Sequence, residues 1–162
     1  MSSCTLIALA RPTFQVDAAQ KFFDEARRLI ESLGITVNGP SNLVMTPEDT
    51  QAAKDSLRSD EDLYILLNAS FSDASPAVSL LSGVKGNVLL WSVREFGEVG
   101  DRLLLNSMCG SNLAAHALRD AGKSAIHIHG NPDEPHIKNA LADAVVGKLP
   151  AIGEPPRIKG IS

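Results

Sequence analysis

Short apolar runs alternate with amphipathic segments along the chain. Four runs have the length of a buried strand, and a weaker one lies near residue 36; together they cover residues 4–10, 35–37, 63–68, 87–92 and 124–129. Between the runs, apolar residues recur three and four positions apart, which is typical of helices with one packed face. This spacing predicts helices over residues 17–33, 46–58, 75–83, 110–121 and 133–149. Residues 103–105 are a candidate for a short extra strand.

Several of the predicted helices have recognisable ends. Asp17 with Gln20 three residues later has the spacing of a capping box. Thr46 stands before Pro47 and two acidic residues, which is a typical helix start. Gly34 is expected to end the first helix, because glycine readily adopts the left-handed conformation of a helix C-terminus.

Strands that alternate with helices favour parallel crossovers in a sheet that is covered on both faces. The fold class is therefore predicted to be α/β: a single three-layer α/β/α domain over residues 1–149, with a five-stranded parallel sheet. Its flavodoxin-like strand order is expected to be 2-1-3-4-5. Residues 150–162 contain three prolines and two glycines, and we interpret them as a linker or as the start of a next domain.

Composition narrows the class of protein. Aromatic residues make up only 4% of the chain, so the core must consist of aliphatic side chains. The net charge is -4 and no cluster of Lys and Arg stands out, which argues against a nucleic-acid partner. No apolar run has the roughly 18 residues of a membrane span, and the N-terminus does not resemble a signal peptide. With two cysteines and no disulfide framework, we expect a cytoplasmic protein without a membrane partner.

Ligands of open α/β sheets bind beyond the carboxyl ends of the strands. Four predicted loops meet this condition, at residues 11–14, 69–73, 92–95 and 106–112. Common phosphate sites of this fold are excluded, because Gly122-Lys123-Ser124 leads from helix into strand and Ala117 replaces the first glycine of a P-loop. A phosphorelay receiver needs an aspartate at the end of the third strand, where Asn68 stands.

Some residues have both a catalytic and a structural interpretation. Cys109 near a helix start is a possible nucleophile, but a small buried residue in a tight turn is the favoured interpretation. His127 and His129 share one side of a strand; we favour structural histidines over metal ligands. A helix that begins near Ser111 places Asn112 and His116 one turn apart, either as a functional pair or, equally well, as a polar pair on the surface.

Charged residues on the predicted loops are further candidates. Asp73 and the pair Arg94-Glu95 follow neighbouring strands and could meet across the loops as an ion pair, which would contribute little to stability if it is exposed. Their position at the carboxyl ends makes them better functional candidates than charges elsewhere.

Three stretches of the chain resemble the N-terminal domain of the L-fucose/L-arabinose isomerase superfamily. They are LLNASFSDASPAVSLL, NVLLWSVREFGEVGDRL and LNSMCGSNLAAHALRDAG, within residues 66–122. The features that carry the resemblance are the strand that ends in NASFS, the LLW strand followed by Arg94-Glu95, and the LNSxCG turn before a helix. The match covers most of the chain in order and spacing.

The resemblance implies a cytoplasmic, multidomain, homo-oligomeric protein that interconverts aldoses and ketoses. It implies a divalent metal, usually Mn²⁺, held by later C-terminal domains, so we expect no catalytic residue, no metal ligand and no bound metal in this chain. The substrate is expected to be a small sugar or sugar acid. The domain is expected to pack against a neighbouring subunit and to lend residues to the rim of its active site. The rim candidates are Phe71, Ser72, Asp73, Arg94, Glu95, Asn106, Cys109, Asn112 and His116.

An alternative of a different class stays open at this point. The chain could instead be a freestanding flavodoxin-like module that binds a small polar ligand or a partner protein without catalysis. The proline-rich segment with a strand-like stretch at residues 157–161 favours the isomerase domain. On either interpretation, the isolated chain is predicted to lack isomerase activity.

Overall fold

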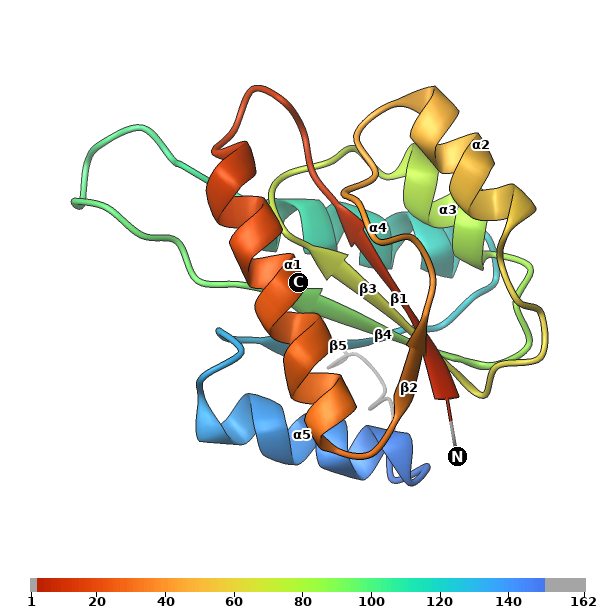
Figure 1. Ribbon diagram of the computed structural model, residues 1–162. Helices are drawn as coiled ribbons and strands as arrows, with labels where there is room; N and C mark the ends of the chain where they lie inside the picture. Colours follow the sequence, from red (N-terminus) through yellow and green to blue (C-terminus); the bar gives the residue numbers. More distant parts are fainter. Residues whose placement is uncertain (1–2, 151–162) are drawn as a thin grey trace, which may run out of the picture.

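The computed structural model describes residues 3–150. Five strands and five helices alternate along this part of the chain (Figure 1). Their bounds are β1 Ser3–Leu9, α1 Val16–Ser32, β2 Thr36–Asn38, α2 Pro47–Asp55, β3 Leu63–Asn68, α3 Ser75–Leu81, β4 Asn87–Ser92, α4 Ser107–Asp120, β5 Ile126–His129 and α5 Pro135–Val145. Residues 151–162, for which a linker or a new strand is predicted, lie outside the described part.

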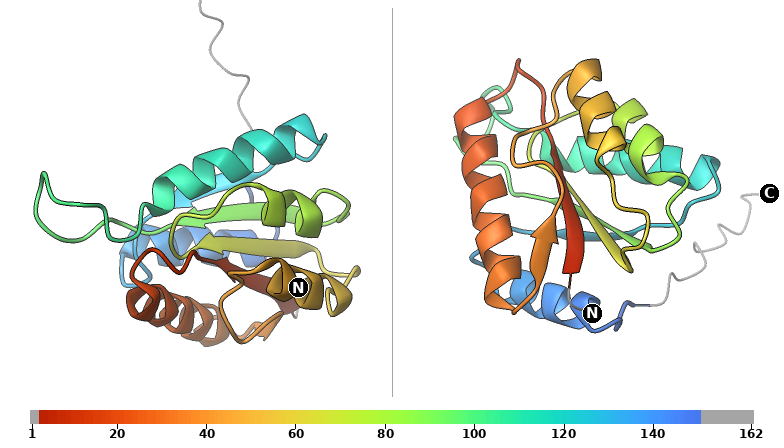
Figure 2. Two further views of the ribbon diagram at one scale, coloured as in Figure 1. Left: turned by 90° about the horizontal axis from the view of Figure 1, so that it is seen from above. Right: turned by 45° about the vertical axis from the view of Figure 1, so that its right-hand side comes forward.

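The strands form one parallel sheet in the order β2-β1-β3-β4-β5. Helices α1 and α5 cover one face, and α2, α3 and α4 cover the other (Figures 1 and 2). The predicted three-layer fold and strand order are therefore confirmed, with β3 at the centre of the sheet.

The two faces of the sheet have separate cores because side chains alternate along each strand. On one face, Leu6 and Ile65 pack with Phe23 of α1 and Leu141 of α5. On the other face, the core is made of aliphatic residues from α2, α3 and α4, together with the buried Tyr64. Every residue of β3 is buried, as expected for a central strand covered on both faces.

The predicted helix starts are partly wrong. Helix α2 has the predicted start, because the Thr46 hydroxyl accepts a hydrogen bond from Asp49 N and the Asp49 carboxylate accepts one from Thr46 N. Helix α1, however, begins at Val16 after Gln15, and no side chain caps it. Asp17 therefore lies inside the first turn, where its negative charge interacts favourably with the helix dipole. The predicted capping box does not form.

Helix α4 begins earlier than the sequence indicates. It starts at Ser107, directly after Asn106, whose backbone has φ 52°. Asparagine tolerates this left-handed conformation, so the chain turns sharply there without a glycine. The predicted extra strand at residues 103–105 is wrong: Leu105 is buried and its carbonyl accepts a hydrogen bond from Phe71 N at 2.7 Å. That contact holds two loops together and extends no sheet.

Among residues 3–150, no helix is both long enough and apolar enough to span a membrane.

Candidate functional site

The loops at the carboxyl ends of the strands lie at one edge of the sheet, because all five strands are parallel. Backbone hydrogen bonds join them: Phe71 N donates to Leu105 O at 2.7 Å, and Gln15 N donates to Leu104 O at 3.0 Å. The segments after β1 and β3 are thus both tied to the segment that leads into α4. The candidate site is this edge, which has two differently built halves.

The first half contains a pocket of about 320 Å³ beside the ends of β1 and β3. We call it the switch-point pocket, because strand order reverses between β1 and β3 and such positions commonly bind ligands in open α/β sheets. Its walls come from Arg11 after β1, from the start of α2, and from the loop between β3 and α3. Hydroxyl groups are frequent in these walls; they belong to Thr46, Thr50, Ser72, Ser75 and Ser79.

Arg11 and Asp73 place one positive and one negative charge at the switch-point pocket. Their side chains are 3.2 Å apart and 40% and 60% exposed, so water and ligands can reach both. The Arg11 guanidinium lies 4.8 Å from the centre of the Phe71 ring, which supports it by a cation–π contact. Phe14 packs against the same ring, with centroids 6.0 Å apart.

Hydrogen bonds keep the Asp73 carboxylate charged. The Ser75 hydroxyl donates to it at 2.8 Å, and the Ser75 N–H and Arg11 also donate. These contacts, with the hydroxyl as the largest contribution, lower the pKa of Asp73. Of the predicted rim residues, Ser72 and Asp73 line the pocket, and Phe71 lies beneath Arg11. Arg11 itself was not among the predicted rim residues, although its place directly after β1 was the available signal.

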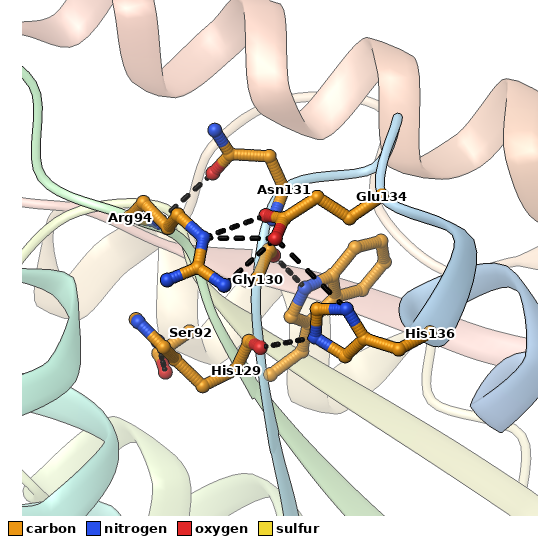
Figure 3. Close-up of polar contacts among 8 residues, drawn as sticks. Ser92, Arg94, His129, Gly130, Asn131, Glu134 and His136 are labelled. Carbon is orange, nitrogen blue, oxygen red and sulfur yellow. Dashed lines mark hydrogen bonds and ion pairs between the residues drawn. The ribbon is translucent and has the colours of Figure 1, made fainter.

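The second half of the edge lies at the ends of β4 and β5 (Figure 3). Arg94 forms an ion pair with Glu134, with Nε 2.9 Å from both carboxylate oxygens and Nη2 2.7 Å from one of them. The Arg94 backbone N–H donates to Asn131 Oδ1 at 2.9 Å. Hydrogen bonds from Arg94 and then from Asn131 N lower the pKa of Glu134 to about 2.

The neighbouring Glu95 binds backbone. Its carboxylate accepts hydrogen bonds from the N–H groups of Leu104, Leu105 and Asn106 at 2.8, 3.1 and 2.7 Å. These bonds close the base of the loop that projects from the domain between β4 and α4 (Figure 1). The ion pair that the sequence allowed between Asp73 and Arg94-Glu95 does not form, because each of the three residues has a different partner.

The remaining predicted rim residues lie on α4 or just before it. Cys109 is exposed in the first turn, so the favoured prediction of a small buried residue is wrong for this cysteine. The buried cysteine is instead Cys4, and burial raises the pKa of its thiol to about 12. Asn112 and His116 are both exposed, and His116 pairs with Asp120 at 3.2 Å. None of these side chains lines the switch-point pocket.

A buried polar contact at the start of α4 was not predicted. The Ser107 hydroxyl donates to Asn68 O and accepts from Val93 N, and the Ser111 hydroxyl donates to Asn68 Oδ1 at 3.0 Å. A Cβ atom on Gly110 would lie 2.8 Å from Asn68 Nδ2. The start of α4 is therefore fitted closely against the end of β3. A serine–glycine–serine pattern alone gives no indication of these partners.

His127 and His129 face the same side of β5, as predicted. His127 Nε2 and His129 Nδ1 each lie 2.8 Å from the hydroxyl oxygen of Ser92. Ser92 is also the residue that pairs with His129 in the sheet. Burial is the largest cause of a lowered pKa at both residues. Within residues 3–150, no three or more His, Cys, Asp and Glu side chains are grouped so that they could hold a metal ion.

Comparisons with known proteins relate the chain to sugar isomerases. No family model matches it. Over 136 residues, or 83% of the chain, it is 30% identical to a protein named sulfoquinovose isomerase from Priestia megaterium. Proteins of the same name from Alkalicoccus urumqiensis and a Clostridium species are 30% and 32% identical over 87% and 86% of the chain. The chain spans about 30% of the length of these relatives.

These relatives agree with the coarser part of the sequence-based prediction, a similarity to enzymes that isomerise a sugar. Membership of the L-fucose/L-arabinose isomerase superfamily stays a prediction, as do the cytoplasmic location and the oligomer.

Proposed function

We propose that this chain is the N-terminal part of an aldose–ketose isomerase and that its switch-point pocket forms part of the rim of the sugar site. The similarity to sulfoquinovose isomerases over more than four-fifths of the chain supports the reaction class. The observation that carries the site is the pocket of about 320 Å³ with Arg11 and Asp73 side by side in its wall.

The chemistry of this pocket suits a hydroxyl-rich ligand. Asp73 is held in its charged form and accepts hydrogen bonds, whereas the Arg11 guanidinium donates them and uses one nitrogen for Asp73. A sugar hydroxyl can donate a hydrogen bond to the Asp73 carboxylate and accept one from the Arg11 guanidinium. A sugar that also carries an anionic group gains a charge-assisted contact with Arg11. Phe71 limits where the guanidinium can lie, which lowers the entropy lost on binding.

The chain is proposed to supply sugar contacts while other domains supply the metal chemistry. Residues 3–150 contain no group of three His, Cys, Asp or Glu side chains that could hold a divalent ion. In line with the resemblance to the L-fucose/L-arabinose isomerase superfamily, Mn²⁺ or another divalent metal is proposed to bind residues of later domains, where it would polarise the carbonyl and hydroxyl groups of the substrate. Packing of this domain against a second copy and against C-terminal domains belongs to the same proposal.

The test uses the full-length gene product with sulfoquinovose, the sugar named in the relatives. Ketose formation is measured for the wild type, for Arg11→Gln and for the control Arg119→Gln, which changes an exposed arginine in the last turn of α4. We expect KM to rise about tenfold for Arg11→Gln, which corresponds to ~1.4 kcal/mol of binding free energy. The kcat of this variant and both constants of the control should stay close to wild type.

The possible results separate the two parts of the proposal. A wild-type protein that forms no ketose from sulfoquinovose or from common aldoses overturns the isomerase assignment. Ketose formation with an unchanged KM in Arg11→Gln overturns only the role of the pocket. The alternative of a freestanding binding module predicts sugar binding by the 162-residue chain without any turnover of the full-length product.

A further inference from the structure

The Ser92 hydroxyl joins two histidines at the outer end of the sheet. Ser92 is the last residue of β4 and is fully buried, whereas His127 and His129 are half-buried on the neighbouring β5. The hydroxyl oxygen lies 2.8 Å from His127 Nε2, 2.8 Å from His129 Nδ1 and 3.8 Å from the sulfur of Met108. We call these three residues the His–Ser–His group: Ser92, His127 and His129.

A hydroxyl has one hydrogen, so it cannot donate to both imidazoles. Either it donates to one and accepts an N–H from the other, or it accepts from both while its hydrogen points to Met108. In each arrangement at least one ring must carry its hydrogen on the nitrogen that faces Ser92. The tautomers of the two rings are therefore coupled, and the group titrates as a unit.

One ring nitrogen of His129 is hydrogen-bonded within the protein, and the other can bind a ligand. Its Nδ1 contacts Ser92, and within residues 3–150 its Nε2 has no hydrogen-bond partner. The residue ends β5, so it lies at the same edge of the sheet as Ser72, which follows β3 and lines the switch-point pocket. Two strand spacings, roughly 10 Å, separate the ends of these strands. A hexose ring with the reach of two side chains spans such a distance.

The surroundings of the group favour neutral imidazoles at neutral pH. Burial is the main reason why the pKa of both rings is lowered, and the repulsion between the two rings adds to it at His127. Three charged or titratable groups face His129 from the adjoining loop and α5: Arg94 and His136 lower its pKa, whereas Glu134 raises it. From α4, the uncharged Met108 contacts the Ser92 hydroxyl.

We propose that His129 is the acid–base residue that this domain contributes to the opening of the sugar ring, with Ser92 and His127 as positioning residues that fix its tautomer. The inference rests on the proposed function, because cyclic aldoses must open before the carbonyl at C1 can be isomerised. Ring opening needs proton transfer at two oxygens. A neutral imidazole with one free nitrogen is a suitable base for the first of them.

The step balances as follows. His129 Nε2 takes the proton of the O1 hydroxyl, the electron pair of the broken O1–H bond forms the second bond between O1 and C1, and the bond between C1 and the ring oxygen breaks with its electrons going to that oxygen. The ring oxygen takes a proton from a water molecule. The imidazolium then returns its proton to the hydroxide left behind, so that the protein ends unchanged and the sugar is the open-chain aldehyde.

The experiment measures anomer exchange, because interconversion of the α and β anomers requires ring opening without isomerisation. Full-length protein is added to sulfoquinovose, and the exchange rate between the anomers is measured by NMR saturation transfer. Ketose formation is measured in the same samples. The variants are His129→Gln, Ser92→Ala and the control Lys138→Gln, an exposed residue of α5. Thermal melting confirms that each variant is folded.

We expect His129→Gln to lose the enzyme-dependent anomer exchange by about 100-fold, the lower end of the usual contribution of acid–base catalysis. Ser92→Ala should lose less, about tenfold, and its pH–rate profile should shift because the tautomer of His129 is no longer fixed. The control should match the wild type. The rate of anomer exchange by the wild type should rise with pH over the range in which the His–Ser–His group loses its proton. At higher pH it should stay constant.

Three results would decide against the inference in different ways. A wild type that forms ketose while His129→Gln exchanges anomers at the wild-type rate overturns the role of His129 and leaves the proposed function standing. A wild type that forms no ketose overturns the proposed function and with it this inference. A pH–rate profile that Ser92→Ala does not move overturns the positioning role of the serine.

Discussion

The two halves of the carboxyl edge use their charged residues in opposite ways. At the ends of β4 and β5, Arg94 is bound by Glu134, and Glu95 accepts three backbone N–H groups. At the ends of β1 and β3, Arg11 and Asp73 touch each other through one contact and border an open pocket. The same residue types therefore hold loops in one half and remain accessible to a ligand in the other.

The reason for this difference lies in the length of the loops. A long segment leaves the domain between β4 and α4, and it exposes Phe96, Val99 and Leu103. Such a segment needs polar contacts at its base, which Glu95 and Arg94 provide. The connection between β3 and α3 is short and is held by the backbone of Phe71. Asp73, the acidic residue of this connection, is therefore not needed to anchor a long loop and lines the pocket.

The largest expected effect comes from Gly110, where the two halves meet. A methyl group there would lie 2.8 Å from Asn68 Nδ2 and 3.1 Å from Ser72 N, so Gly110→Ala must displace the loop that carries Phe71. We expect the free energy of unfolding to fall by about 2 kcal/mol, as is usual for overpacking. Urea unfolding of the 162-residue chain measures it. Gly83→Ala, with no atom within 4 Å of the added methyl, is the matched control.

A smaller loss is expected for Glu95→Ala. Three backbone N–H groups lose a charged acceptor, but water can reach part of this site, so we expect a decrease of about 1–2 kcal/mol in the free energy of unfolding. Amide hydrogen exchange at Leu104 and Asn106 should become faster. Glu98→Ala, in the exposed part of the same loop, should change neither measurement. Equal effects of the two substitutions would contradict the anchoring role of Glu95.

The Arg94–Glu134 pair predicts a dependence on pH. The folded pKa of Glu134, about 2, is below its ordinary value of 4.5. The contribution of the carboxylate to stability is thus complete above its ordinary pKa, and it is lost as pH falls toward 2. Melting temperatures measured across this range should fall less steeply for Arg94→Gln than for the wild type. Parallel curves for the two proteins would show that Arg94 does not set the titration of Glu134.

The smallest effect on stability is expected at the switch-point pocket. Asp73→Asn removes half of an exposed ion pair, and exposed pairs contribute little, so the free energy of unfolding should change by about 0.5 kcal/mol or less. Sugar binding by the full-length protein should nevertheless weaken, because the pocket loses its negative charge. A stability loss as large as that of Glu95→Ala would mean that the two halves are built alike.

Much of the fold could be predicted from local patterns. The five apolar runs became the five strands, and the length and apolar character of residues 63–68 identified the central one. The common side of His127 and His129 followed from the alternation of side chains in a strand. The start of α4 could not be predicted, because an asparagine in a left-handed conformation carries the turn that glycine usually marks.

The candidate site was predicted less completely. The sequence placed its loops at one edge of the sheet, since strand direction alone determines that. It did not indicate that Arg11 pairs with Asp73 across 62 positions or that Arg94 pairs with Glu134 across 40. Such pairings depend on which loop tips approach one another after the sheet has formed.

The sequence by itself thus determined the five strands, their order in the sheet and the edge at which ligands are expected, because hydrophobic periodicity is a local property of the chain and alternating strands and helices favour parallel crossovers. Only the tertiary structure decided which charged side chains are bound by other parts of the protein and which remain accessible to a ligand. Neighbouring residues illustrate this: Arg94 and Glu95 follow the same strand, yet one binds a side chain of another loop and the other binds backbone. Contacts between loops are set by distances in space, which the spacing of residues along the chain does not record.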